Sequence, residues 1–129
     1  MKNETEVEVV LPFPDQRLNP NRSKGKHWGS TVALRKAARV GAKVLALEAA
    51  GAVRFNPEAE LALTVTFVQP DRRSRDRDNL LAACKPMLDG IADALGVNDS
   101  QFEPVTICRE YGGKPGSVRV KISASSTYG

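Results

Sequence analysis

The strongest constraint on the fold is a strict alternation of residue types from residue 61 to residue 67. The larger apolar positions are Leu61, Leu63, Val65 and Phe67, with Ala62, Thr64 and Thr66 between them. Because successive residues of a strand point to opposite faces, the pattern predicts a strand with one face in the core. Pro70 follows this strand, and proline cannot donate a hydrogen bond to a sheet.

One helix is predicted before this strand in the sequence and another after it. The first begins at Ser30, a favourable capping residue, and ends near Ala50, where Gly51 follows. Its core side is expected at positions three and four apart: Ala33, Ala37, Val40, Val44 and Leu47. Four basic residues fall on another face of this helix: Arg35, Lys36, Arg39 and Lys43.

The second helix is predicted from about residue 80 to residue 95, and Gly96 ends it. Its apolar stripe consists of Leu80, Cys84, Met87, Leu88, Ile91 and Leu95, and the opposite side carries Lys85, Asp89 and Asp93. Pro86 lacks a backbone donor, so we expect a break or a kink close to Cys84.

Three further strands are expected at residues 7–11, 105–111 and 118–122. In the last of them Val118, Val120 and Ile122 point inward. The element order β-α-β-α-β-β predicts an α+β, sandwich-like fold with two helices and a mixed sheet of about four strands. We expect one domain over residues 1–129, in which residues 123–129 form a flexible tail.

Length and composition are those of an ordinary water-soluble domain: 129 residues, 41% hydrophobic and 26% charged. No apolar run is long enough to cross a membrane, and the first eight residues are too acidic for a signal peptide. We therefore expect a cytoplasmic protein without a membrane partner. Cys84 and Cys108 are expected to be reduced thiols in the core, with a disulfide as the alternative.

Histidine is nearly absent from the chain, and this argues against two classes of site. His27 is the only histidine, and together with two cysteines it shows no spacing typical of a zinc site. A Ser-His-Asp triad is also disfavoured, because a single histidine near the first helix would have to serve it.

The segment from residue 70 to residue 79 reads P-D-R-R-S-R-D-R-D-N and carries the clearest chemical signal. Asp76 and Asp78 are two apart, so in an extended chain their carboxylates lie on the same side and repel unless a cation separates them. Mg²⁺ is the usual cation at such a site, often together with substrate phosphates. The neighbouring arginines suit a phosphate: Arg72, Arg73, Arg75 and Arg77. The alternative is that the aspartates are turn and helix-cap residues.

A basic block extends from residue 16 to residue 47, where no acidic residue occurs. Its eight members are Arg17, Arg22, Lys24, Lys26, Arg35, Lys36, Arg39 and Lys43. Such a block is typical of a nucleic-acid surface. We assign DNA contacts to Lys24, Lys26, Arg35, Arg39 and Lys43, and the alternative is a solvated basic face. Trp28 either packs at the start of the first helix or stacks on an exposed base.

The motifs together resemble the RusA family of Holliday-junction resolvases and their phage-encoded relatives. The likeness covers most of the chain: L-P-F-P at 11–14, L-N-P-N at 18–21, R-D-R-D-N at 75–79, K-x-x-x-D at 85–89 and G-V-N-D-S-Q at 96–101. The resemblance implies a small homodimeric endodeoxyribonuclease that cuts four-way DNA junctions with Mg²⁺ in recombination and repair. Mn²⁺ is the expected substitute for Mg²⁺.

The resemblance also implies roles for individual residues. Asp76 and Asp78 match the two metal-binding aspartates of the R-D-x-D-N motif, and Asp99 matches the third. Lys85 is similar to the active-site lysine, which would neutralise charge that grows in the transition state. Asn79 matches the motif asparagine and is a candidate supporting residue. Asp89 is a second candidate for support, with a surface role as the alternative.

This chain departs from the family pattern at two places. Five residues separate Asn79 from Lys85, and Ala82 occupies the alternative position for the lysine. Asn98 stands where a second aspartate is frequent in the late motif. Two other functions therefore remain open: a DNA-junction-binding protein that has lost catalysis on the same scaffold, and a nuclease that cuts flaps or forks.

Overall fold

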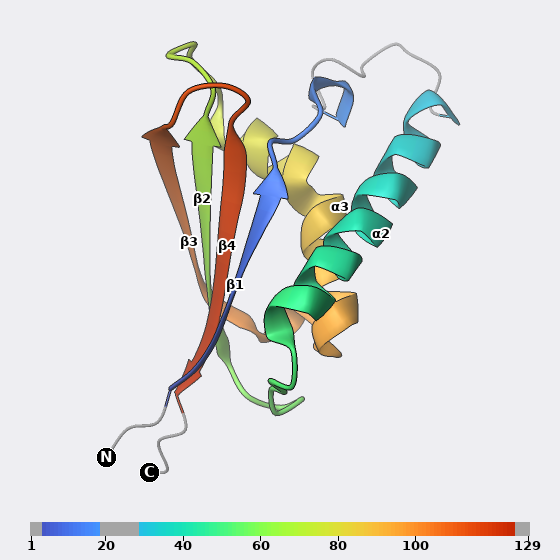
Figure 1. Ribbon diagram of the computed structural model, residues 1–129, viewed down its shortest axis with the longest axis vertical. Helices are drawn as coiled ribbons and strands as arrows, with labels where there is room; N and C mark the ends of the chain where they lie inside the picture. The colour runs from blue at the N-terminus through green and yellow to red at the C-terminus, as the bar shows by residue number, and fades with distance from the viewer. Residues whose placement is uncertain (1–3, 19–28, 126–129) are drawn as a thin grey trace.

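Two helices cover one face of a four-stranded mixed sheet in the computed structural model, which describes residues 4–18 and 29–125 (Figure 1). The elements follow in the order β1 (Glu4–Pro12), η1 (Gln16–Leu18), α2 (Gly29–Ala50), β2 (Leu61–Gln69), α3 (Arg77–Leu95), η2 (Asp99–Gln101), β3 (Phe102–Tyr111) and β4 (Ser117–Ser125). The predicted fold class and the order β-α-β-α-β-β are therefore confirmed.

The spatial order of the strands is β1-β4-β2-β3. β4 pairs antiparallel with both β1 and β2, while β2 and β3 are parallel. Parallel neighbours need a crossover connection, and α3 provides it. As a result the carboxyl ends of β2 and β3 meet at one edge of the sheet, where Gln69 is the partner of Tyr111.

The core lies between the sheet and the helices, and most of the predicted inward faces form it. The buried residues include all four larger positions of the 61–67 alternation, the three inward residues of the last strand and the whole predicted stripe of the second helix. These predictions are confirmed. Gly51 and Gly96 have positive φ values of 54° and 67°, and each follows directly after a helix as predicted.

α3 is longer than predicted and is not interrupted. It begins at Arg77 and continues through Pro86 to Leu95, so the predicted break near Cys84 is wrong. Proline at this position leaves the carbonyl of Ala82 without its helical donor. Ala82 is exposed, so this carbonyl can bind water, and buried side chains on both sides of Pro86 keep the two halves packed on the sheet.

α2 packs on the core with a different face from the one predicted. Val40, Val44 and Leu47 are 56%, 50% and 50% exposed, whereas the buried residues of the helix are Thr31, Ala42, Ala46 and Ala50. The reason is the close approach of the two helices, because a β-carbon at Gly90 of α3 would clash with the carbonyl oxygen of Arg39. Only small side chains fit at such a crossing. We call the five exposed positions the α2 stripe: Ala33, Ala37, Val40, Val44 and Leu47.

The two cysteines differ in their surroundings, and both are free. Cys84 is buried, and burial raises the pKa of its thiol to about 12. Cys108 is exposed, which corrects the prediction of a core thiol. It lies on β3, which is one of the two edge strands of the sheet and has mostly exposed residues.

The carboxyl-terminal strand is also longer than predicted. β4 continues to Ser125, so residues 123–125 belong to the sheet, and residues 126–129 lie outside the described part of the chain. In the described ranges no helix combines the length and the apolar character that crossing a membrane requires.

Candidate functional site

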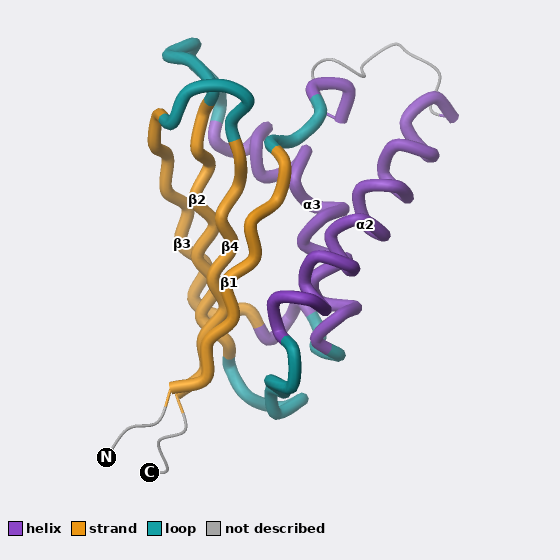
Figure 2. Tube along the Cα trace, viewed as in Figure 1, coloured by secondary structure: helices purple, strands orange, loops and turns teal. Residues whose placement is uncertain are grey.

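Asp76, Asp78 and the predicted arginines of residues 72–77 follow directly after β2, at the end of the sheet where the parallel strands end. Figure 2 shows the loop between β2 and α3 and the loop between β3 and β4 at the same end of the sheet. Ligands of open sheets with parallel strands bind outside the carboxyl ends of those strands. The fold therefore displays residues 70–78 where a scaffold of this type usually places reactive groups.

Arg75 and Asp71 shape the loop after β2. Arg75 Nη1 donates to Asp71 Oδ1 over 2.9 Å, and the backbone N–H of Arg73 donates to the same oxygen. The hydrogen bond from Arg75 holds the pKa of the Asp71 carboxyl below its usual value. The Arg75 guanidinium also lies over the Phe13 ring, 5.3 Å from the centroid. Arg75 is thus an internal support of the loop, with a side chain only 11% exposed.

Asp76 caps the amino terminus of α3. Its Oδ1 accepts a hydrogen bond of 2.8 Å from the backbone N–H of Asp78, which lies in the first turn. For Asp76 the alternative reading of a helix-cap aspartate is therefore correct. Both side chains are exposed, and among the described residues no hydrogen-bond donor contacts the Asp78 carboxylate or Asp76 Oδ2.

Lys85 lies between two other carboxylates. Its Nζ is 2.7 Å from Asp89 Oδ1 and 3.4 Å from Asp99 Oδ2. The hydrogen bond with Asp89, followed by weaker effects that include Asp99, raises the pKa of Lys85. The ammonium group therefore remains charged at any physiological pH.

The structure does not gather the three predicted metal ligands at one place. Asp78 and Lys85 are seven positions apart on α3, which is about 10 Å along the helix axis. Asp99 contacts Lys85 and follows the opposite end of α3 from the one that Asp76 caps. Within residues 4–18 and 29–125 no three His, Cys, Asp or Glu side chains form a group that could hold a metal ion.

The separation has a direct cause in the fold. α3 is unbroken, and the β2-α3-β3 crossover carries the chain from one end of the sheet to the other before Asp99 occurs. Asp76 and Asp78 fit a metal site with only two protein carboxylates. Mg²⁺ in proteins is often held by one or two carboxylates together with substrate phosphates and water. The exposed oxygens of this pair satisfy that requirement, whereas Asp99 contacts Lys85.

A basic groove runs between the two helices, with a cavity volume of about 490 Å³. Its lining residues are Arg35, Lys36, Arg39, Ala82, Lys85, Pro86 and Asp89. Arg39 makes two hydrogen bonds to Asp93, of 2.7 and 2.9 Å, which lower the pKa of Asp93 and raise that of Arg39. The groove thus combines two predicted DNA contacts, Arg35 and Arg39, with Lys85.

The remaining predicted residues are placed as follows. Lys43 is exposed on α2, and Arg72, Arg73 and Arg77 are exposed around the loop after β2. Asn79 is half-buried in the first turn of α3. Lys24, Lys26 and Trp28 lie outside the described residues.

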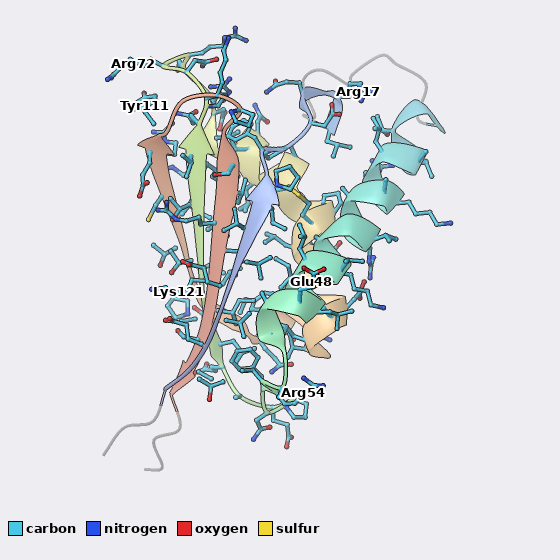
Figure 3. All side chains as sticks on the ribbon, in the orientation of Figure 1. Arg17, Glu48, Arg54, Arg72, Tyr111 and Lys121 are labelled. Atoms are coloured by element: carbon cyan, nitrogen blue, oxygen red, sulfur yellow. The ribbon has the colours of Figure 1, made fainter. Side chains whose placement is uncertain are left out.

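Three residues near this loop were not identified from the sequence: Gln69, Arg109 and Tyr111. Arg109 Nη1 donates to the carbonyl oxygen of Arg75 over 2.9 Å. The Arg72 guanidinium lies over the Tyr111 ring, 4.9 Å from its centroid, and Figure 3 shows the two side chains at the same end of the sheet. Gln69 directly precedes the arginine-rich loop, whereas only the parallel pairing of β2 and β3 brings Arg109 and Tyr111 to it, and no local pattern reveals that pairing.

No family model matches this chain. It is 41% identical over 95 residues to a protein of Xylella fastidiosa (strain Temecula1 / ATCC 700964) whose description reads "Uncharacterized protein". The matched region covers 73% of this chain and 61% of the Xylella protein. The chain therefore spans less than two thirds of the length of this relative.

Proposed function

We propose that this protein is a Mg²⁺-dependent endodeoxyribonuclease that cuts branched DNA, in the manner of the RusA-type Holliday-junction resolvases that its motifs resemble. The observation that carries the proposal is the position of Asp76 and Asp78. Both have exposed carboxylate oxygens at the carboxyl edge of a parallel strand pair, next to an arginine-rich loop.

In this proposal Asp76 and Asp78 hold the metal ion, and Mn²⁺ can replace Mg²⁺. A bound ion of this kind polarises a phosphoryl oxygen and lowers the pKa of a bound water. Asp76 Oδ1 also caps the start of α3, and this hydrogen bond orients the whole carboxylate. Loss of either aspartate is expected to cost on the order of a hundredfold in cleavage rate.

The arginines divide into a support and a set of DNA contacts. Arg75 is held by Asp71 and Phe13 and keeps the loop in shape. Arg72, Arg73 and Arg77 are exposed, and their guanidinium groups suit the phosphates that flank the cut. Lys85 is part of the groove between the helices, and Asp89 and Asp99 orient its ammonium group.

The basic groove supports a branched substrate. Arg35, Lys36 and Arg39 on α2 together with Lys85 on α3 place several positive charges along one channel. Contacts of this type bind phosphates without reading base sequence, so they recognise the course of a DNA strand. A junction, in which strands change direction, is the expected ligand.

We also propose that the protein acts as a homodimer, with the α2 stripe as the contact between two copies. Successive members of the stripe are four, three, four and three residues apart, which is the spacing of a helix seam that packs on another helix. The stripe faces away from the core, and three of its members are at least half exposed. Exposed apolar surfaces of this kind mark interaction sites. Two copies would supply the two active sites that paired cuts require.

A second candidate function is junction binding without cleavage. It is favoured by the distance between Asp99 and the Asp76–Asp78 pair, and by the capping role of Asp76. In both cases we propose action in the cytoplasm, where free thiols such as those of Cys84 and Cys108 persist.

Incubation with end-labelled DNA tests the proposal. The substrates are a four-way junction, a flap and a plain duplex, each with Mg²⁺, with Mn²⁺ and with a chelator. A resolvase produces paired nicks in the junction with either metal and leaves the duplex intact. Retention of the junction in a gel without nicks supports the binding protein instead, and faster cutting of the flap supports the nuclease of broader specificity.

A further inference from the structure

A second cavity lies beside the metal-binding pair and is independent of it. Its volume is about 390 Å³, within the range of small-molecule sites. The lining consists of the strand ends Gln69, Arg109 and Tyr111 and the loop residues Arg72, Arg73, Ser74 and Arg75. Four of these seven residues are arginines, so the cavity suits an anionic ligand that is large enough to fill it.

Gln69 provides the evidence for a ligand with polar edges. The residue is 3% exposed, and its Oε1 has no hydrogen-bond partner among the described residues. A buried amide oxygen without a partner is unfavourable, and buried polar groups in native proteins are nearly always satisfied. A donor from a bound molecule would remove this cost.

Arg75 adds a buried donor to the same cavity. Its Nε is also without a partner in the described part of the chain. The guanidinium cannot turn away to find one, because Asp71 holds its Nη atoms and Phe13 lies beneath it. Two residues that line the cavity, Gln69 and Arg75, thus each contain a buried polar atom without a partner, one an acceptor and one a donor.

Arg72 and Tyr111, which both line the cavity, form a stacked pair. Tyr111 is 55% exposed, and the Arg72 guanidinium lies over its ring. Aromatic rings and guanidinium planes are the surfaces on which unstacked bases rest in single-strand-binding proteins. Inorganic phosphate alone would use the arginines but neither this surface nor the Gln69 acceptor.

From these features we infer that the cavity binds one unstacked nucleotide of the DNA substrate. The base stacks on the Arg72–Tyr111 pair, its polar edge faces Gln69 and Arg75, and its phosphate lies among the exposed arginines. On its Watson–Crick edge every base has a donor beside an acceptor, so the cavity accepts an unpaired nucleotide of any sequence. This inference rests on the proposed function in one respect, because it takes the nucleotide to be part of a DNA substrate.

Binding of mononucleotides, measured by titration calorimetry or by chemical shifts without Mg²⁺, tests the inference. The four deoxynucleoside monophosphates are compared with 2-deoxyribose 5-phosphate and with inorganic phosphate. We expect the nucleotides to bind at least about fivefold more tightly than the sugar phosphate, which is the low end of the contribution of base stacking. Gln69→Leu and Tyr111→Ala should each remove most of this difference and leave the binding of sugar phosphate unchanged.

The matched control is Gln16→Leu, which replaces an exposed glutamine away from this cavity and should bind as the parent does. If Gln69→Leu does not fold, Tyr111→Ala decides the outcome, because Tyr111 is exposed. Equal affinities for nucleotide and sugar phosphate, or nucleotide binding that survives both substitutions, would overturn the inference. Asp76→Asn should bind mononucleotides normally, so failure of the nuclease proposal and failure of this one are distinguishable.

Discussion

Arg39 and Asp93 join α2 to α3 through two parallel hydrogen bonds of 2.7 and 2.9 Å. Arg39 lines the basic groove, and its neighbour along the same wall is Arg35. Asp93 therefore fixes the direction of one cationic side chain in the groove. The pair connects the stability of the helix layer to the surface on which we propose that DNA lies.

The first prediction concerns acid stability. Arg39 lowers the pKa of Asp93 in the folded protein, so the pair contributes stability above the usual aspartate pKa and loses it as pH falls through the lowered value. Asp93→Asn should therefore be less stable than the parent at pH 6, and the difference should shrink towards pH 2. Urea midpoints at a series of pH values measure it. A difference that is constant over this range would contradict the role of Asp93.

The second prediction concerns the helix crossing at Gly90. Gly90→Ala places a methyl group against the Arg39 carbonyl and should destabilise the fold by about 1–3 kcal/mol. Gly41→Ala is the matched control, since a β-carbon at Gly41 meets no atom within 4 Å. In the control, alanine should stabilise α2 by about 0.5–1 kcal/mol. Equal effects of the two changes in urea unfolding would disprove the close approach.

The third prediction concerns the thiols. A chromogenic aromatic disulfide should react rapidly with one cysteine of the native protein and with both after unfolding. Cys108 is exposed, while burial raises the pKa of Cys84 to about 12, so Cys84 presents almost no thiolate. Cys108→Ser should abolish the rapid reaction. Rapid reaction of two thiols per native chain would show that Cys84 is not buried.

The fourth prediction concerns the α2 stripe. Val40→Asp places a charge in the middle of the stripe and should convert a dimer to a monomer. Val32→Asp is the control, because Val32 is 46% exposed on the same helix but lies off the stripe. Light scattering after gel filtration should give twice the chain mass of 14.0 kDa for the parent and the control. A parent of single-chain mass at tens of micromolar would refute the dimer.

The sequence predictions are confirmed where the local residue pattern allows only one arrangement. In β2 the two-residue period allows only one apolar face, so the sequence alone predicts the burial of Leu61, Leu63 and Val65. In α2 two faces are apolar, one of alanines and one that includes valine and leucine. The prediction that the larger side chains of α2 face the core is wrong, because the close contact at Gly90 admits only small residues.

The site was harder to predict, because it depends on how distant segments meet. The pairing of Asp76 with the α3 amino terminus is local, and the motif indicated it as an alternative. The position of Asp99 depends on whether α3 breaks at Pro86, which no local rule decides. Gln69 and Tyr111 become neighbours only through the parallel register of β2 and β3.

The most direct test of the central claim separates DNA binding from cutting in Asp76→Asn and Asp78→Asn. Glu58→Gln is the control, an exposed carboxylate far along the chain from this pair. Junction affinity is measured in a chelator, and the single-turnover cleavage rate is measured with Mg²⁺. We expect both variants to bind the junction as the parent does and to cut it at least about a hundredfold more slowly, with the control unchanged. Cleavage by either variant at the parental rate would contradict a metal-dependent nuclease site at these two aspartates.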